Sequence, residues 1–188
     1  MKVPNPDGFA APLLRLPALL VLCLSLLAAP AGATTEQDTL FEALKNAPNE
    51  AEARKIEDDI WYSWLDAAPT ADIRQKVDDA MRRRGAYDFK GAKELLDQVV
   101  VEAPDYSEGW NQRAFILFLQ GNYEASLEDI ERTLALEPRH FGALSGRAII
   151  FMTQGRVKLG QKALKEALAI HPFLKERSML IMPEELDL

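Results

Sequence analysis

Three prolines in this 188-residue chain follow one another at a constant interval. Pro104, Pro138 and Pro172 are spaced by 34 residues each. Self-similarity at that period is typical of helix–turn–helix units that stack into a solenoid. Placing each proline near the end of a unit divides the chain into units 73–106, 107–140 and 141–174. The proline spacing therefore constrains the architecture more than any other feature of the sequence.

The second and third units match each other at eight aligned positions. Two of these positions have a clear physical reason. Gly121 and Gly155 are expected to end the first helix of each unit, where a left-handed cap favours a residue without a Cβ. Ala114 and Ala148 leave room where two helices cross. The other matched pairs are Arg113/Arg147, Ile116/Ile150, Gln120/Gln154, Leu134/Leu168, Ala135/Ala169 and Pro138/Pro172.

The remainder of the chain after residue 33 also has helical periodicity, and alternating strand patterns are nearly absent. Thr34 or Thr35 can cap a first helix that stops near Pro48, and Asn49 can cap a second. We expect residues 34–72 to form an N-terminal helical cap over the exposed end of the solenoid. Trp61 and Trp64 are expected to be buried packing residues of this cap. At the other end, residues 175–188 are predicted to be a C-terminal cap helix, up to about Met182, and an acidic tail.

Units two and three resemble the tetratricopeptide repeat. The signature residues in unit two are Trp110, Ala114, Leu117, Gly121, Tyr123, Ile130, Leu134 and Pro138. Those in unit three are Leu144, Ala148, Phe151, Gly155, Leu164, Ala167, Leu168 and Pro172. Unit one is degenerate: Arg83 occupies an apolar position, although Ala80, Phe89, Ala92, Leu96, Val99 and Pro104 agree. The phrases around Trp110 and His140 also resemble a bacterial and plastid group of secreted or organellar repeat proteins without assigned activity.

The resemblance implies an all-α fold, a right-handed superhelical solenoid of antiparallel helix pairs with helical caps. It also implies that the first helix of each unit lines a concave groove that binds a partner protein. The groove residues carried over by position are Arg74, Val77, Met81, Glu108, Asn111, Phe115, Phe118, Leu119, Ser145, Ile149 and Met152, with Arg84, Gly85, Gly142 and Thr153 at the same positions. The Lys/Asn/Arg clamp of the chaperone-tail-binding members is absent, since its positions hold Val77, Met81, Gln112, Gly142 and Gly146.

Arg113 and Arg147 occupy a position that is apolar in most such repeats. A buried guanidinium must be paired, because an isolated charge is costly to bury. One hypothesis is a ladder of ion pairs between stacked units, for which Glu108, Glu131 and Glu137 are near in sequence. The other is that both arginines bind a partner's carboxylate.

No set of residues in the sequence indicates catalysis. The chain lacks nucleophile-elbow, phosphate-loop and zinc-protease motifs. His140 and His171 lie at unit boundaries, where a histidine is expected to hydrogen bond to a helix end rather than act on a substrate. With one Cys and two His, no zinc site can form. We therefore predict a protein that is not an enzyme and has no cofactor, metal or evident small-molecule substrate.

The charge of the chain narrows the class of partner. There are 22 Lys and Arg against 29 Asp and Glu, a net charge of −7. A nucleic-acid-binding protein needs a basic face, so nucleic acid is excluded as a partner. The only basic run, Arg82–Arg84, ends a helix, where cations are favourable. Any membrane contact is expected to be peripheral.

Residues 1–33 have the pattern of a secretory signal peptide. Lys2 and Arg15 precede an apolar run from Leu16 to Ala29, and Ala31-Gly32-Ala33 has the small residues of a cleavage site. The run is short for a membrane span, although an uncleaved anchor is the alternative. Lipidation at Cys23 is disfavoured because Leu22, rather than a small residue, precedes it. Cleavage after Ala33 would give an exported, most simply periplasmic, chain of 155 residues without Cys.

These observations predict an exported, non-catalytic protein–protein interaction adaptor or scaffold that binds an apolar or amphipathic segment in its groove. The alternative function is a structural component of an envelope complex that acts through self-association. The apolar patch Met179–Met182 is expected mainly to cap the last unit, although folding back into the groove is the alternative.

Overall fold

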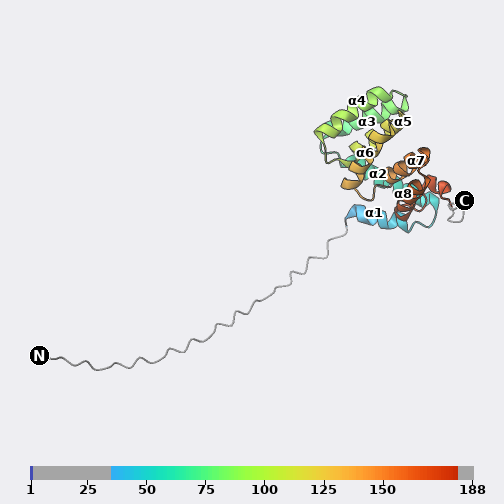
Figure 1. Cartoon of the computed structure of the whole chain (residues 1–188), viewed down its shortest axis with the longest axis horizontal. Helices are drawn as coiled ribbons and strands as arrows, with labels where there is room; N and C mark the ends of the chain where they lie inside the picture. The colour runs from blue at the N-terminus through green and yellow to red at the C-terminus, as the bar shows by residue number, and fades with distance from the viewer. Residues whose placement is uncertain (2–34, 182–188) are drawn as a thin grey trace. The chain divides into compact units, whose positions relative to one another are not determined.

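The computed structural model describes Met1 and residues 35–181 of the chain (Figure 1). This part contains helices and no strand. The helices are α1 (Glu36–Lys45), α2 (Glu50–Asp66), α3 (Ala71–Gly85), α4 (Phe89–Glu102), α5 (Ser107–Leu119), α6 (Tyr123–Leu136), α7 (Phe141–Thr153), α8 (Val157–Ile170) and the 3-10 helix η1 (Lys175–Met179). The predicted signal peptide and Cys23 lie outside the described residues. No helix among the residues described has the length and apolar character needed to cross a membrane.

Helices α3 to α8 form three antiparallel pairs that stack in chain order, α3–α4, α5–α6 and α7–α8. Each helix packs on the next one along the chain, and the first helices also contact one another, α3 with α5 and α5 with α7. These first helices therefore share one face, the concave face. The predicted all-α solenoid of helix pairs is confirmed. We call the pairs unit one, unit two and unit three.

The turn inside each unit repeats at the expected 34-residue interval. Gly121 and Gly155 have φ angles of 76° and 73°, the left-handed conformation that favours glycine. Unit one has Tyr87 at the equivalent position, with φ 61°. Unit one thus keeps the turn geometry of the other units while lacking the residue that best accommodates it.

The α1–α2 hairpin begins with the predicted caps. Thr35 forms a capping box with Asp38, and the Asn49 side chain accepts a hydrogen bond from the backbone N–H of Glu52. Its location differs from the prediction of a cap at the N-terminal end of the solenoid. Only the end of α2 packs on unit one, through Leu65. The rest of the hairpin packs on unit three, in a core of Phe41, Leu44, Ala53, Ile60, Trp64, Phe141, Leu144, Ala167 and Leu174.

The C-terminal part of the described chain is also different from the prediction. Among the described residues after α8, no α-helix forms; instead, η1 is a single 3-10 segment of 5 residues, and Met182 lies outside the described residues. Gln161 of α8 binds the end of η1 and the residues after it, because its Nε2 donates to the carbonyl of Met179 and its Oε1 accepts from the N–H of Ile181. The segment is therefore held on α8 by hydrogen bonds from one side chain to its backbone rather than by the apolar face of a helix.

Candidate functional site

Helix α2 brings two tryptophans against the start of α7. The indole of Trp64 stacks on the imidazole of His140, with ring centroids 3.9 Å apart and an interplanar angle of 10°. Trp61 meets Phe141 edge-on at 5.7 Å. Gly142 is required here, since a Cβ at this position would lie 2.8 Å from the ring of Trp61. Thus α2 covers part of the face that the repeats would otherwise leave open.

A buried carboxylate anchors the polar groups beneath these rings. Glu108 and His140 are both 0% exposed, and Glu108 Oε2 lies 3.0 Å from His140 Nε2. The other ring nitrogen, Nδ1, accepts a hydrogen bond from the N–H of Ala143 at the start of α7. Because Nδ1 accepts a hydrogen bond, the proton of the imidazole is on Nε2, and this N–H donates a hydrogen bond to the carboxylate of Glu108. The side-chain amides of Asn111 and Gln112 also donate to Glu108.

A second histidine joins α2 to the end of the repeats. His171 is fully buried, and its Nε2 lies 3.2 Å from Glu57 Oε2, while Nδ1 accepts from the N–H of Phe173. This contact lowers the pKa of the Glu57 carboxyl below its ordinary value, mainly through the hydrogen bond from His171. Each histidine therefore bonds to local backbone on one side and to a glutamate from a distant helix on the other. Neither arrangement leaves a ring nitrogen free to act on a substrate.

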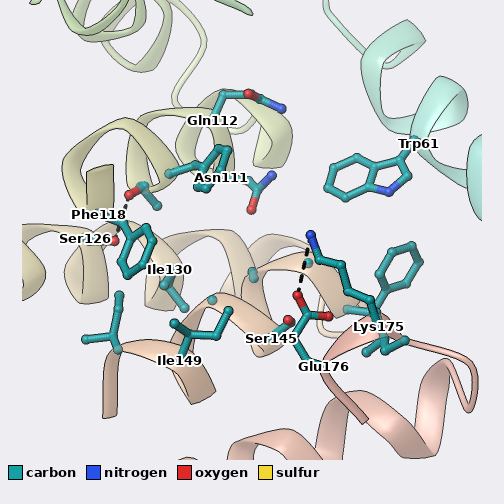
Figure 2. A pocket seen from close by; sticks show the side chains of 18 of the residues that line it. Trp61, Asn111, Gln112, Phe118, Ser126, Ile130, Ser145, Ile149, Lys175 and Glu176 are labelled. Carbon is teal, nitrogen blue, oxygen red and sulfur yellow. Dashed lines mark hydrogen bonds and ion pairs between the residues drawn. The ribbon is translucent and has the colours of Figure 1, made fainter. Parts of the chain in front are cut away.

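The uncovered part of the concave face is a cavity of about 380 Å³, which we call the concave pocket. Trp61 stands at one side and Phe118 and Ile149 at the other, with Lys175 and Glu176 of η1 near the Trp61 side (Figure 2). The apolar wall consists of Met81, Phe115, Phe118, Ile130, Ile149 and Ile150. The polar groups are Glu57, Arg84, Asn111, Gln112, Ser126, Ser145, Lys175 and Glu176. The pocket is thus mostly apolar, with polar groups that can orient a ligand.

The predicted groove residues fall into two groups. Six line the concave pocket: Met81, Asn111, Phe115, Phe118, Ser145 and Ile149. The structure places the other five elsewhere. Val77 is buried in the core of unit one, and Glu108 is buried beneath the pocket. Arg74 pairs with Asp66 and Asp78.

The two remaining predicted groove residues lie near the end of their helices. Leu119 is partly exposed at the end of α5, and Met152 packs beside Ala148, Ala163 and Leu164. Of the positions carried over with the groove, Arg84 and Gly142 line the pocket, whereas Gly85 and Thr153 do not.

Arg113 and Arg147 are held in ion pairs that connect neighbouring units. Arg113 of α5 binds Asp129 of its own unit through two hydrogen bonds of 2.7 Å, and reaches Asp97 of unit one at 3.2 Å. These partners raise the pKa of Arg113 further above its ordinary value, chiefly through the bond to Asp129.

Arg147 repeats the arrangement one unit later. It binds Glu131 of unit two at 3.0 Å and Glu166 of its own unit at 2.6 Å. Of the three predicted glutamates, Glu131 is a partner of Arg147, whereas Glu108 and Glu137 bind neither arginine. Both arginines therefore form ion pairs between stacked units, as in the first of the two hypotheses for them.

Arg84 differs from these arginines because its guanidinium is half-buried in the wall of the concave pocket with no carboxylate at ion-pair distance, and the buried Glu108 acts on it only electrostatically. Nη1 donates to Gln112 Oε1 at 2.8 Å, and the guanidinium lies over the ring of Phe115, 5.0 Å from its centroid. Among the residues that the structure describes, Arg84 forms no ion pair. Burial lowers the pKa of Arg84 below its ordinary value. A half-buried cation in an apolar wall is a natural contact for an anionic group of a ligand.

Sequence reasoning missed the pocket residues contributed from outside the first helices. Glu57 and Trp61 come from α2, and Lys175 and Glu176 come from η1. Trp64 is buried as predicted, but Trp61 is only half-buried and faces the pocket. No local signal could have placed these residues, because their neighbours in space are far away in the sequence.

The described residues hold no converging set of three His, Cys, Asp or Glu side chains that could bind a metal ion. The pocket residues offer a ligand apolar contact, hydrogen bonds from side-chain amides and hydroxyls, and the charged groups of Arg84, Lys175, Glu57 and Glu176.

Comparison with known proteins places the repeats in a family. The tetratricopeptide repeat model matches residues 107–140, the range assigned above to unit two. A TPR repeat-containing protein of Rhizobium etli is 39% identical over 140 residues, covering 72% of this chain. The aligned region covers 66% of that protein, just under two thirds of its length.

Two solved structures are similar in fold. The TPR domain of Sgt2 from Aspergillus fumigatus superposes with a TM-score of 0.51 at 20% identity, covering 54% of this chain and 67% of that one. MamA has a TM-score of 0.50 at 13% identity, covering 79% of this chain and 80% of that one. At these identities the similarity concerns the architecture of stacked helix pairs.

Proposed function

We propose that this chain, which is a tetratricopeptide repeat protein, is an exported, non-catalytic adaptor that binds a short apolar segment of a partner protein in its concave pocket. Proteins built from this repeat are typically non-catalytic interaction modules, which supports the binding of a protein partner. The observation that carries the proposal is the apolar wall of the pocket, which remains open although α2 covers the face beside it.

The dimensions of the concave pocket limit what the partner can present. A volume of about 380 Å³ lies within the range of roughly 300–1,000 Å³ that ligand pockets occupy. A helix with its side chains is about 10–12 Å across, so a whole helix cannot enter. We therefore favour an extended or turn segment that inserts one or two large apolar side chains between Phe118 and Ile149. Asn111 and Ser145 are placed to hydrogen bond to its backbone.

Selection of peptides followed by matched substitutions tests this proposal. Peptides selected from a random library on the full chain should quench or shift the fluorescence of Trp61, which lines the pocket. Phe115→Ala should weaken their binding at least tenfold. Leu159→Ala is the control, because Leu159 is also 43% exposed but lies on α8 outside the pocket. Equal affinities for the two variants would reject the pocket as the binding site.

Export rests on the sequence of residues 1–33. The basic start, the apolar run and Ala31-Gly32-Ala33 support secretion with cleavage after Ala33. Intact-mass measurement of the protein recovered from its native host tests this directly. The expected chain begins at Thr34, and a full-length mass in a membrane fraction would instead indicate an uncleaved anchor.

Self-association is the rival function, and the oligomeric state distinguishes it. An adaptor with an open pocket should be a monomer in light scattering coupled to size exclusion, and should stay monomeric when a selected peptide is bound. A concentration-dependent dimer that Phe115→Ala dissociates would support the structural role instead.

A further inference from the structure

Two arginines among the described residues have no carboxylate within ion-pair distance, and they differ in their surroundings. Arg156 is exposed, stacks on Phe151 and hydrogen bonds weakly to Gln154. Arg84 is half-buried in the wall of the concave pocket, between Gln112 and Phe115. Every other arginine of this part of the chain is ion-paired, including Arg54, Arg74, Arg82, Arg83, Arg113, Arg132, Arg139, Arg147 and Arg177. Arg84 is therefore the arginine of the pocket wall that can form a direct ion pair with an entering carboxylate, since the buried Glu108 acts on it only through space and through Gln112.

The end of the chain has the complementary composition. Residues 183–188 are Pro-Glu-Glu-Leu-Asp-Leu, with three carboxylates and two leucines and no basic residue. Ile181, shortly before this segment, is bound to Gln161, whose Nε2 also contacts the sulfur of Met152. Met152 lies one helical turn beyond the pocket residue Ile149 on α7. Residues 175 and 176, just before, line the pocket themselves.

We propose that residues 183–188 bind in the concave pocket, with a tail carboxylate paired to Arg84 and Leu186 against the apolar wall. This inference rests on the proposed function, because the tail would then compete with the partner segment for the same pocket. The bound tail would occupy the pocket as a removable plug. A partner segment would then bind only if its affinity for the pocket were high enough to displace the tail.

The tether makes even a weak contact effective. Seven residues can extend over at most about 25 Å, roughly twice the width of a helix, and Lys175 and Glu176, shortly before residues 182–188, already line the pocket. A tether of this length holds its end at an effective concentration of about 1 mM. A tail whose dissociation constant as a free peptide is about 0.1 mM would therefore fill about 90% of the pockets and weaken a competing peptide about tenfold.

The test uses a chain that ends at Met182 and a fluorescent peptide with the sequence of residues 182–188. Truncation removes none of the described contacts, so the thermal transition of the truncated chain should match that of the full chain. Anisotropy should show the peptide binding to the truncated chain at least tenfold more tightly than to the full chain. In the truncated chain, Arg84→Gln should weaken the peptide at least tenfold, and the matched control Arg156→Gln should change it less than twofold.

A second variant covers the case in which truncation itself disturbs the fold. Replacing Glu184, Glu185 and Asp187 together by Lys in the full chain should open the pocket to the peptide by the same factor. Equal binding to full and truncated chains, no binding to either, or equal effects of the two arginine substitutions would each overturn the inference. Tail-dependent dimers in sedimentation would also overturn it, because the tail would then occupy the pocket of a second copy.

The two proposals can fail separately. If selected peptides bind in the pocket equally well with and without the tail, the adaptor function stands and the plug is rejected. If the tail peptide binds but no foreign peptide displaces it, the plug stands and the adaptor function is rejected.

Discussion

The three repeat units and the α1–α2 hairpin are held in place by different kinds of contact. In α3–α8 each helix packs on its chain neighbours, and ion pairs of Arg113 and Arg147 recur one unit apart. The hairpin instead contacts residues far along the chain. Glu57 pairs with His171, 114 residues away, while the backbone of Leu65 accepts a hydrogen bond from Tyr106, 41 residues away.

This difference shows that the hairpin connects the ends of the repeat stack. Leu65 belongs to the core of unit one, and Trp64, one residue before it, belongs to the core shared with unit three. In an open solenoid each unit contacts only its neighbours, so local disruption stays local. Here, the first and last units share one helix as a packing partner. Substitutions in the hairpin and in the ion pairs of Arg113 and Arg147 can show which of the two contributes more to the free energy of unfolding.

The largest effect is expected for Trp64→Ala. Trp64 is 2% exposed and contacts Phe41, Phe141 and the imidazole of His140. Truncating a buried aromatic side chain costs about 3–5 kcal/mol, to be measured by urea denaturation. Amide hydrogen exchange should show lost protection in α7 and α8 as well as in α1 and α2. Loss confined to the hairpin would mean that the repeats do not depend on it.

Substitution of the two ladder arginines should give unequal losses. Arg113→Met leaves the carboxylate of Asp129, whose side chain is 5% exposed, without its cation. This change should lower the free energy of unfolding by about 2–3 kcal/mol. Arg147→Met leaves Glu131 and Glu166, which are 61% and 41% exposed, and should cost less than about 1 kcal/mol. Chemical denaturation of both variants checks the order. Equal losses would show that burial of the acidic partner does not control the strength of the ladder.

Acid should weaken the hairpin more than the repeats. The pKa of Asp38 is lowered to about 2 by hydrogen bonds from Thr35 and from Arg139, and that of Glu50 to about 2 by Arg54 and Arg177. His171 lowers the pKa of Glu57. A lowered pKa in the folded state gives stability that is present above the unfolded pKa and is lost as pH falls through the folded value.

Glu57→Gln should therefore cost about 1 kcal/mol near pH 7, and the difference from the unmodified protein should shrink below pH 4.5. Glu52→Gln is the control on the same helix, because Glu52 pairs only with Lys55 within α2 among the described residues. Thermal melts between pH 3 and 7 provide the measurement. If the stability difference between Glu57→Gln and the unmodified protein were constant across this range, the ionised carboxylate of Glu57 would have no role in the contact with His171.

The smallest effect is expected in the turn of unit one. Tyr87 is 83% exposed and has the left-handed backbone conformation that the other units give to glycine. Relief of that strain should make Tyr87→Gly more stable by about 0.5–1 kcal/mol, with part of the gain offset by the greater chain entropy of glycine. Gly121→Ala, the matched change in unit two, should be destabilising by a similar amount. If both changes destabilise, contact of Tyr87 with Phe89 outweighs the backbone strain.

The sequence predicted the repeat architecture because its determinants are local and periodic. The prolines, Gly121 and Gly155 and the caps Thr35 and Asn49 each act within a few residues of their own position. The Arg147–Glu131 pair was also accessible, since both residues lie within neighbouring helices. Asp97 and Asp129 were missed because many carboxylates lie at similar distances in sequence.

The pocket was predicted only in part, for a physical reason. The repeat register specifies which positions of a first helix turn toward the concave face, and it placed Phe115, Phe118 and Ile149 correctly on the pocket wall. It does not specify what covers that face. Glu108 has the register of a groove residue, yet it is buried because His140 and the tryptophans of α2 pack over it. Such contacts depend on the hairpin, whose position follows from no period.

Sharing α2 between the first and last units also limits how this protein can evolve. Arrays of stacked helix pairs commonly lengthen by duplication, because a new copy needs only its two neighbours. A fourth copy inserted here would move Phe141 and His171 away from Trp64 and Glu57, which stay at a fixed separation from Leu65 on one rigid helix. The length of α2 therefore matches a stack of three repeats. If the array gained a repeat, α2 would also have to lengthen in order to contact both the first and the last unit.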